Sequence, residues 1–125
     1  MFAYETAGAP VYILRFIGSF DAADEAAYLA ALDDLVMRPP GFVMVLVFGN
    51  SNRMSPEGYR AMALWFKRHR DDLGRLCLGL ARVRPDSDPA TIDDANFRKA
   101  MPFPTVVLRS EAEAMAWARL QLEAA

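Results

Sequence analysis

The polar residues best placed to do chemistry lie together in residues 49–55, GNSNRMS. Asparagine and serine side chains bond the main chain in turns, and an arginine among them can pair with an anion. Ser55 stands directly before Pro56, an order typical of a helix N-cap followed by a first-turn proline. Because free amide groups at a helix N-terminus bind anions, this segment predicts contact with an anion or a partner protein. The predicted binding residues are Asn50, Ser51, Asn52, Arg53 and Ser55. The alternative is that Asn50, Ser51 and Asn52 only form a turn and that Ser55 only caps the helix.

A second candidate site is apolar. Phe97, Met101 and Phe103 surround a proline-rich break, and Trp117 follows in the last predicted helix. These four residues predict a pocket between helices and sheet for a small apolar or amphipathic ligand. The alternative is that the first three form the inner side of a short helix.

Other kinds of site lack the residues that they need. His69 is the only histidine and Cys77 the only cysteine. The sequence therefore offers no recognisable catalytic triad, no metal-binding cluster and no intrachain disulfide. No G-x-G-x-x-G follows a strand, so a dinucleotide site is not indicated either. We expect a protein that is not an enzyme, with no metal and no cofactor, in which Cys77 is a small buried hydrophobe.

Composition narrows the class of protein. The 125 residues are 54% hydrophobic and 24% charged, which predicts a single globular domain spanning 1–125. A net charge of −2 argues against a nucleic-acid partner. No signal peptide is recognisable and no apolar run approaches the roughly 20 residues of a membrane span, so a cytoplasmic location is expected.

The run Val43–Phe48 is the most apolar strand candidate and predicts a central strand buried on both faces. Alternating strands and helices around it predict an α/β fold with a mixed, mostly parallel sheet of about five strands and about four helices. The other predicted strands are Phe2–Thr6, Val11–Ile17, Leu76–Val83 and Thr105–Leu108, the first two forming an antiparallel edge hairpin. The predicted helices run from Asp21 to about Met37, from Pro56 to about Leu73, from Asp88 or Thr91 to about Ala100, and from Ser110 to about Glu123.

The second of these helices also predicts an interaction surface. Leu64 points away from its apolar stripe and Trp65 flanks it, while Gly74 suits the residue after the helix end. Exposed apolar side chains at Leu64 and Trp65 would favour self-association, most simply as a two-fold homodimer.

The order of elements resembles the SpoIIAA-like family of the STAS (sulfate transporter and anti-sigma factor antagonist) superfamily. The matching segments are VYILRFIGSFDAAD at Val11–Asp24, VMVLVFG at Val43–Gly49, CLGLARV at Cys77–Val83, and VVLRSEAEAMAWARLQL at the C-terminal end. The resemblance spans nearly the whole chain.

This resemblance implies a cytoplasmic, non-enzymatic regulatory module that binds a protein and needs no cofactor. In anti-sigma factor antagonists of this fold, a partner kinase phosphorylates a serine at the start of the second helix. Ser55 is the best match to that serine and Ser51 the second. Our first hypothesis is therefore a STAS-like protein-binding module that acts through residues 49–59. The alternative is a carrier or sensor of a small apolar or amphipathic ligand bound between helices and sheet.

Overall fold

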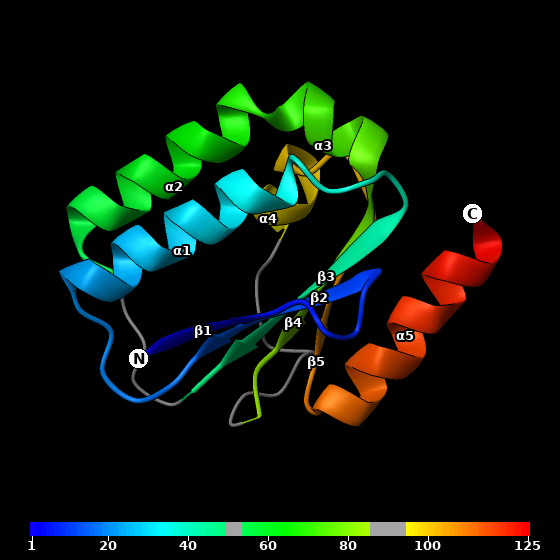
Figure 1. The fold of residues 1–125 in the computed structure, drawn as a ribbon, viewed down its shortest axis with the longest axis horizontal. Helices are drawn as coiled ribbons and strands as arrows, with labels where there is room; N and C mark the ends of the chain where they lie inside the picture. The colour runs from blue at the N-terminus through cyan, green and yellow to red at the C-terminus, as the bar shows by residue number, and fades with distance from the viewer. Residues whose placement is uncertain (50–53, 86–94) are drawn as a thin grey trace.

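The computed structural model describes residues 1–49, 54–85 and 95–125 and shows an α/β fold built on a five-stranded mixed sheet (Figure 1). Across these described residues the elements are β1 (Phe2–Glu5), β2 (Val11–Phe16), α1 (Ala22–Leu35), β3 (Phe42–Phe48), α2 (Pro56–Arg68), α3 (Arg70–Leu76), β4 (Cys77–Val83), α4 (Ala95–Ala100), β5 (Thr105–Leu108) and α5 (Glu111–Ala124).

The strands lie in the sheet in the order of the chain, β1-β2-β3-β4-β5. β1 is antiparallel to β2, whereas β2, β3, β4 and β5 are parallel to their neighbours. The predicted N-terminal hairpin and the predicted central strand are both confirmed. β3 is central because its residues Phe42–Leu46 are buried and can only be covered from both sides.

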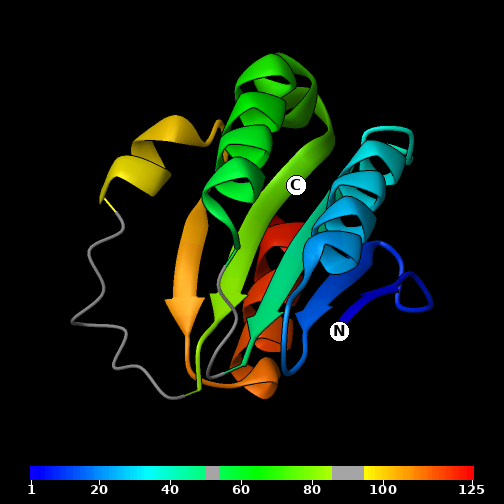
Figure 2. The ribbon, with the colours of Figure 1, turned by 90° about the vertical axis from the view of Figure 1, so that its left-hand side faces the viewer.

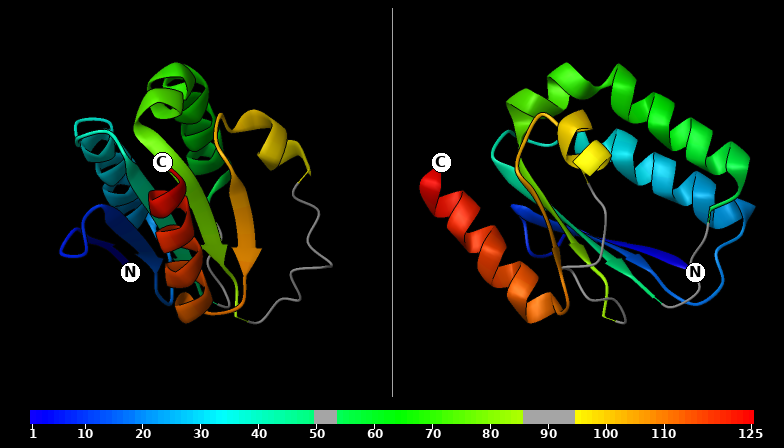
Figure 3. Two further views of the ribbon diagram at one scale, coloured as in Figure 1. Left: turned by 90° about the vertical axis from the view of Figure 1, so that its right-hand side faces the viewer. Right: turned by 180° about the vertical axis from the view of Figure 1, so that it is seen from behind.

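The crossovers place the helices on one face of the sheet. Each step from β2 to β5 moves one strand in the same direction, and right-handed crossovers then put every connecting helix on the same side. Figure 2 shows α4, α2 and α1 on that side, with α5 behind the sheet. Because α5 follows the last strand, it is free to cover the opposite face, as both views of Figure 3 show.

Two cores result, one on each face of the sheet. The first joins Phe16, Met44 and Leu80 to the buried sides of α1 and α2. The second joins Val45 and Ala81, among other small residues of β3 and β4, to the alanines of α5. Alternate residues of each buried strand therefore belong to different cores.

The second predicted helix is divided at His69. The backbone of His69 leaves the helical region at φ −103° and ψ 12°, and α3 begins at the next residue. This break explains why the structure has five helices among its described residues and not the expected four. Gly74 does not end a helix as predicted but lies inside α3, where a Cβ would come within 3.3 Å of Pro102. A glycine at this position allows the close approach of α3 and the segment before β5.

The environment of Trp65 differs from the prediction. Its side chain is buried, with only 6% exposed, and its indole Nε1 donates a hydrogen bond to Asp33 Oδ1 at 2.7 Å. The expectation of an exposed Trp65 is therefore wrong, since an indole can be buried when its N–H finds an acceptor. Leu64 is 53% exposed, as predicted.

Candidate functional site

A cavity of about 220 Å³ lies at the carboxyl ends of β2, β3 and β4. Open parallel sheets commonly bind ligands at this end of their strands. Its lining comes from the sheet, from α1, α2 and α4, and from the segments flanking them. The lining residues are Phe16, Phe20, Tyr28, Leu46, Phe48, Met54, Tyr59, Met62, Phe66, Arg82, Arg84 and Phe97. Ten of these twelve side chains are aromatic or aliphatic and two are arginines.

Aromatic rings make the floor of the cavity. Phe16 and Phe48 are register partners at the ends of β2 and β3, and their rings stack with centroids 4.8 Å apart and planes 3° from parallel. The ring of Phe20 lies 5.1 Å from that of Phe16. Parallel pairing places the two strand ends at the same level, so the register itself brings these rings together.

The helical side of the cavity joins α1 to α2. Tyr28 of α1 is fully buried, and its hydroxyl lies 3.5 Å from Sδ of Met62 in α2. Burial raises the pKa of Tyr28 well above its ordinary value, so the phenol is neutral at physiological pH. Tyr59, one turn before Met62, is 51% exposed and forms part of the rim.

Two guanidinium groups lie at the sheet side of the cavity. Cζ of Arg82 lies 4.1 Å from the ring centroid of Phe97, and Cζ of Arg84 lies 4.2 Å from that of Phe48. Both arginines are half-buried. Side chains at i and i+2 of an extended chain share a side, and here that side is the one covered by α1, α2 and α4. The cavity is therefore aromatic along its length and cationic at one wall.

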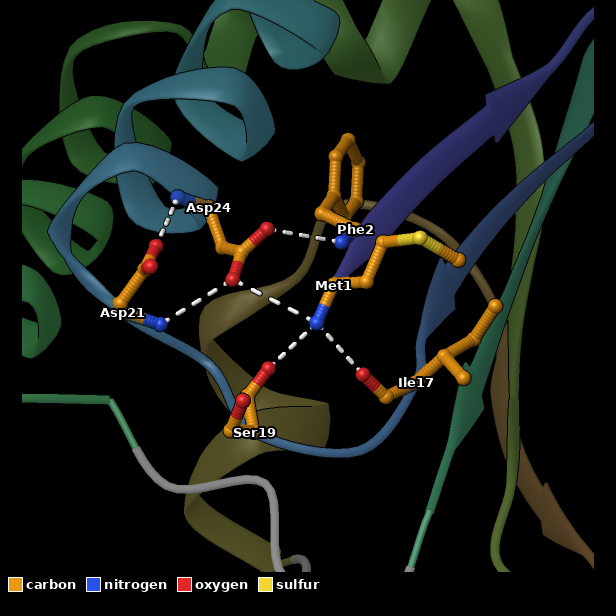
Figure 4. Close-up of polar contacts among 6 residues, drawn as sticks. All are labelled: Met1, Phe2, Ile17, Ser19, Asp21 and Asp24. Carbon is orange, nitrogen blue, oxygen red and sulfur yellow. Dashed lines mark hydrogen bonds and ion pairs between the residues drawn. The ribbon is translucent and has the colours of Figure 1, made fainter.

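The loop that carries Phe20 is fixed by a network of polar contacts around the first residue (Figure 4). The amino group of Met1 donates to the carbonyl oxygens of Ile17, at 2.5 Å, and Ser19, and it lies 3.4 Å from Asp24 Oδ2. The Asp24 carboxylate also accepts the backbone amides of Phe2 and Asp21, at 2.9 and 3.1 Å. These bonds hold the pKa of Asp24 below its usual range, the Asp21 amide contributing most. The loop between β2 and α1 is thus tied to β1.

At the start of α2, Ser55 is the N-cap that the sequence predicts. Its Oγ accepts the amide of Gly58 at 3.0 Å and donates to Glu25 Oε2 at 3.0 Å, while its own amide donates to Glu25 Oε1 at 2.8 Å. A carboxylate of α1 therefore occupies the place where an external anion would meet this helix end. A phosphate on Ser55 would compete with Glu25 for the same position.

Gly58 makes room for that carboxylate. A Cβ at this position would lie 2.2 Å from Glu25 Oε2 and 2.6 Å from its Cδ. The glycine in the first turn of α2 is thus required by packing across to α1.

The remaining predicted binding residues of the loop, Asn50, Ser51, Asn52 and Arg53, lie outside the described residues. Met54, the described residue of the loop next to Ser55, lines the cavity. Its place beside Ser55 is the only feature of the sequence that points to this role.

The four residues of the predicted apolar pocket lie in different places. Phe97 lines the cavity, Met101 lines an adjoining hollow between α2 and α4, and Phe103 is buried in the first core. Trp117 lies on the opposite face of the sheet, in the second core, where its ring packs against Gly79. The prediction of one pocket shared by all four residues is therefore wrong, because α5 carries Trp117 on the other side of the sheet. Phe97 alone belongs to the cavity.

Sequence reasoning missed Arg82 and Arg84 as site residues. The signal was present in β4, where hydrophobic residues alternate between the two cores and Arg82 stands at a position facing the first core. An arginine at an inward position of a buried strand calls for a partner or a function.

The described residues offer no reactive thiol, no cluster of metal ligands and no membrane-spanning helix. Cys77 is buried, and burial raises the pKa of its thiol to about 12, which makes it unreactive at physiological pH. Within residues 1–49, 54–85 and 95–125 no group of three or more His, Cys, Asp or Glu side chains could hold a metal ion. In the same part of the chain, every helix is too short or too polar to cross a bilayer.

Comparison of the chain with protein-family models, with curated proteins and with solved structures finds no match. What the fold and the site define is an α/β protein with an aromatic cavity at the carboxyl ends of its parallel strands. The resemblance to the SpoIIAA-like family stays a prediction.

Proposed function

We propose that the chain is a binding module for a small amphipathic molecule, which it carries or senses in the aromatic cavity. The observation that carries this proposal is the cavity itself, about 220 Å³ in volume and lined by ten apolar or aromatic side chains with two arginines. Well-formed apolar pockets with a few polar groups are the usual form of small-molecule sites. Among the described residues, no nucleophile with an adjacent base lines the cavity, so binding and not catalysis is the function that these residues support.

Methionine methyl groups give a direct test. Met54 and Met62 line the cavity, whereas Met37 is 82% exposed and stands apart from it as an internal control. In protein labelled with carbon-13 at the methionine methyls, titration with indole is expected to shift the Met54 and Met62 signals saturably and to leave Met37 unchanged. Replacement of Met62 by tryptophan, which fills the cavity, should abolish the shift of Met54, while Met37→Trp should preserve it.

Two results would contradict the proposal. One is the absence of any saturable shift with indole or another bicyclic probe. The other is an unchanged affinity in a folded Met62→Trp protein, which would place the probe elsewhere. Native mass spectrometry of freshly purified protein adds an independent measurement, since a retained ligand gives a mass above that of the polypeptide.

The second candidate is the protein-binding function predicted for residues 49–59. The observation that favours it is the exposure of the start of α2, where the Glu57 side chain is 76% exposed and does not line the cavity. Glu57→Lys should remove a bound partner without changing indole binding. Glu123→Lys, the same charge change near the end of α5, is the matched control. Affinity capture in which both variants retain the same proteins as the wild type would exclude this candidate.

A further inference from the structure

The arginine wall gives the ligand a chemical class, an inference that rests on the proposed binding function. Arg84 follows β4 directly, and the ring of Phe48 holds its guanidinium in place from one side. Stacking on an aromatic ring fixes the plane of a guanidinium and leaves its N–H edge able to bind an acceptor.

The described charged side chains that line the cavity are all positive. Among the residues that the structure describes, Arg82 and Arg84 are the only charged ones that line the cavity, and none of its lining residues carries a carboxylate. Four other arginines in the described part of the chain, Arg15, Arg38, Arg60 and Arg75, pair with carboxylates. Arg84 has no such ion pair among the described residues, although it is half-buried. An anionic group on the ligand would complement this wall.

The volume limits the apolar part of the ligand. An apolar cavity of about 150 Å³ holds one benzene molecule, with six carbon atoms. In proportion, the cavity of about 220 Å³ accommodates about nine non-hydrogen atoms. This is the size of a bicyclic aromatic ring system such as indole or naphthalene.

We infer that the ligand is a monocarboxylic acid with a bicyclic aromatic body, the ring lying among Phe16, Phe48 and Phe97 and the carboxylate bound by Arg84. The planar fork of an arginine matches the two oxygens of a carboxylate. Arg82, two residues earlier on the same side of the chain, adds positive potential at the same wall.

Probes that share one ring system and differ in charge test this inference. The wild-type protein, labelled at its methionine methyls, is titrated with 1-naphthaleneacetate, with the neutral 1-naphthaleneacetamide and with 1-naphthyl phosphate. The acetate is expected to bind about tenfold more tightly than the amide, the effect of one charge-assisted contact. Arg84→Gln should remove this preference and leave the affinity for the amide within about twofold. Arg109→Gln, an exposed arginine beyond β5, is the matched control and should keep the preference.

The outcomes separate this inference from the proposed function. Equal binding of acetate and amide would overturn the carboxylate assignment but leave the cavity as a binding site, whereas failure of every probe would refute both. A preference that survives in Arg84→Gln, or tighter binding of the phosphate than of the acetate, would also overturn the inference. If Arg84→Gln does not fold, as judged by its thermal unfolding, Arg84→Lys replaces it. A lysine keeps the charge but lacks the bidentate fork, and the preference for acetate over amide should fall several-fold.

Discussion

The contact between Gly58 and Glu25 predicts a substitution whose effect on stability changes sign with its background. Alanine in place of glycine within a helix ordinarily stabilises by up to about 1 kcal/mol. Here the added methyl group would lie 2.2 Å from Glu25 Oε2 and must displace the carboxylate. Displacement breaks the two hydrogen bonds that join Glu25 to Ser55, at 2.8 and 3.0 Å.

The loss of these two hydrogen bonds sets the expected change in the free energy of unfolding. Each is a bond to a charged group, and we take the lower end of the usual range, about 1.5 kcal/mol, because Ser55 and Glu25 are half-buried. A loss of about 3 kcal/mol against a gain of about 1 leaves Gly58→Ala destabilised by about 2 kcal/mol. For a chain of this size that corresponds to a fall in Tm of about 6–10 °C. In a Glu25→Ala protein nothing remains to be displaced, and the same substitution should stabilise by about 0.5–1 kcal/mol.

The assay is urea unfolding of the four proteins of this cycle, followed by tryptophan fluorescence and by circular dichroism. The expected coupling free energy between the two positions is about 3 kcal/mol. Gly58→Ala stabilising the wild-type protein as much as the Glu25→Ala protein would refute the reasoning, since it would show that the carboxylate does not lie at this helix end in solution.

Further predictions concern single side chains. Ser55→Ala should lower the free energy of unfolding by about 1–2 kcal/mol in urea, since the cap and one bond to Glu25 are lost. Trp65→Phe should cost about 1–2 kcal/mol, because the hydrogen bond from the buried indole to Asp33 and part of the buried ring area are lost, and an unchanged urea midpoint would contradict this. Hydrogen bonds, from Tyr4 first and then from Arg38, hold the pKa of Asp34 below its usual range. The contribution of Asp34 to stability is therefore fully present above its unfolded pKa, near 4, and is lost as the pH falls through its folded pKa. Asp34→Asn should flatten the acid side of a plot of unfolding free energy against pH. Cys77 should react with a thiol reagent at pH 8 only after unfolding, and rapid reaction of the native protein would show that the thiol is accessible.

Local patterns in the sequence were sufficient for most of the elements. The cap at Ser55, the apolar run of β3 and the N-terminal hairpin each depend on residues close together in the chain. The break at His69 was not predicted, because the apolar spacing continues across it to Leu73, which is fully buried. Whether a periodic stretch is one helix or two depends on what the second half packs against.

The site depended on contacts between distant segments. Glu25 lies 30 residues before Ser55, and nothing in either local sequence indicates that they meet. Phe97 and Trp117 have similar apolar surroundings in the sequence but lie on opposite faces of the sheet. The handedness of the crossovers decides which face the connecting helices cover, whereas α5 follows the last strand and can cover the other face, so the composition of a helix does not reveal its side.

The sequential order of the strands also affects how the protein folds while it is being synthesised. Every strand from β2 onward pairs with the strand that precedes it in the chain, so none needs a later strand in order to dock. Each parallel pairing therefore joins a new strand to one that has already been made. We expect the sheet and its first core to assemble from the N-terminal end during synthesis. The second face, with Val45 and Ala81, remains uncovered until α5 is complete, so a chain that stops before α5 should expose an apolar sheet surface and aggregate.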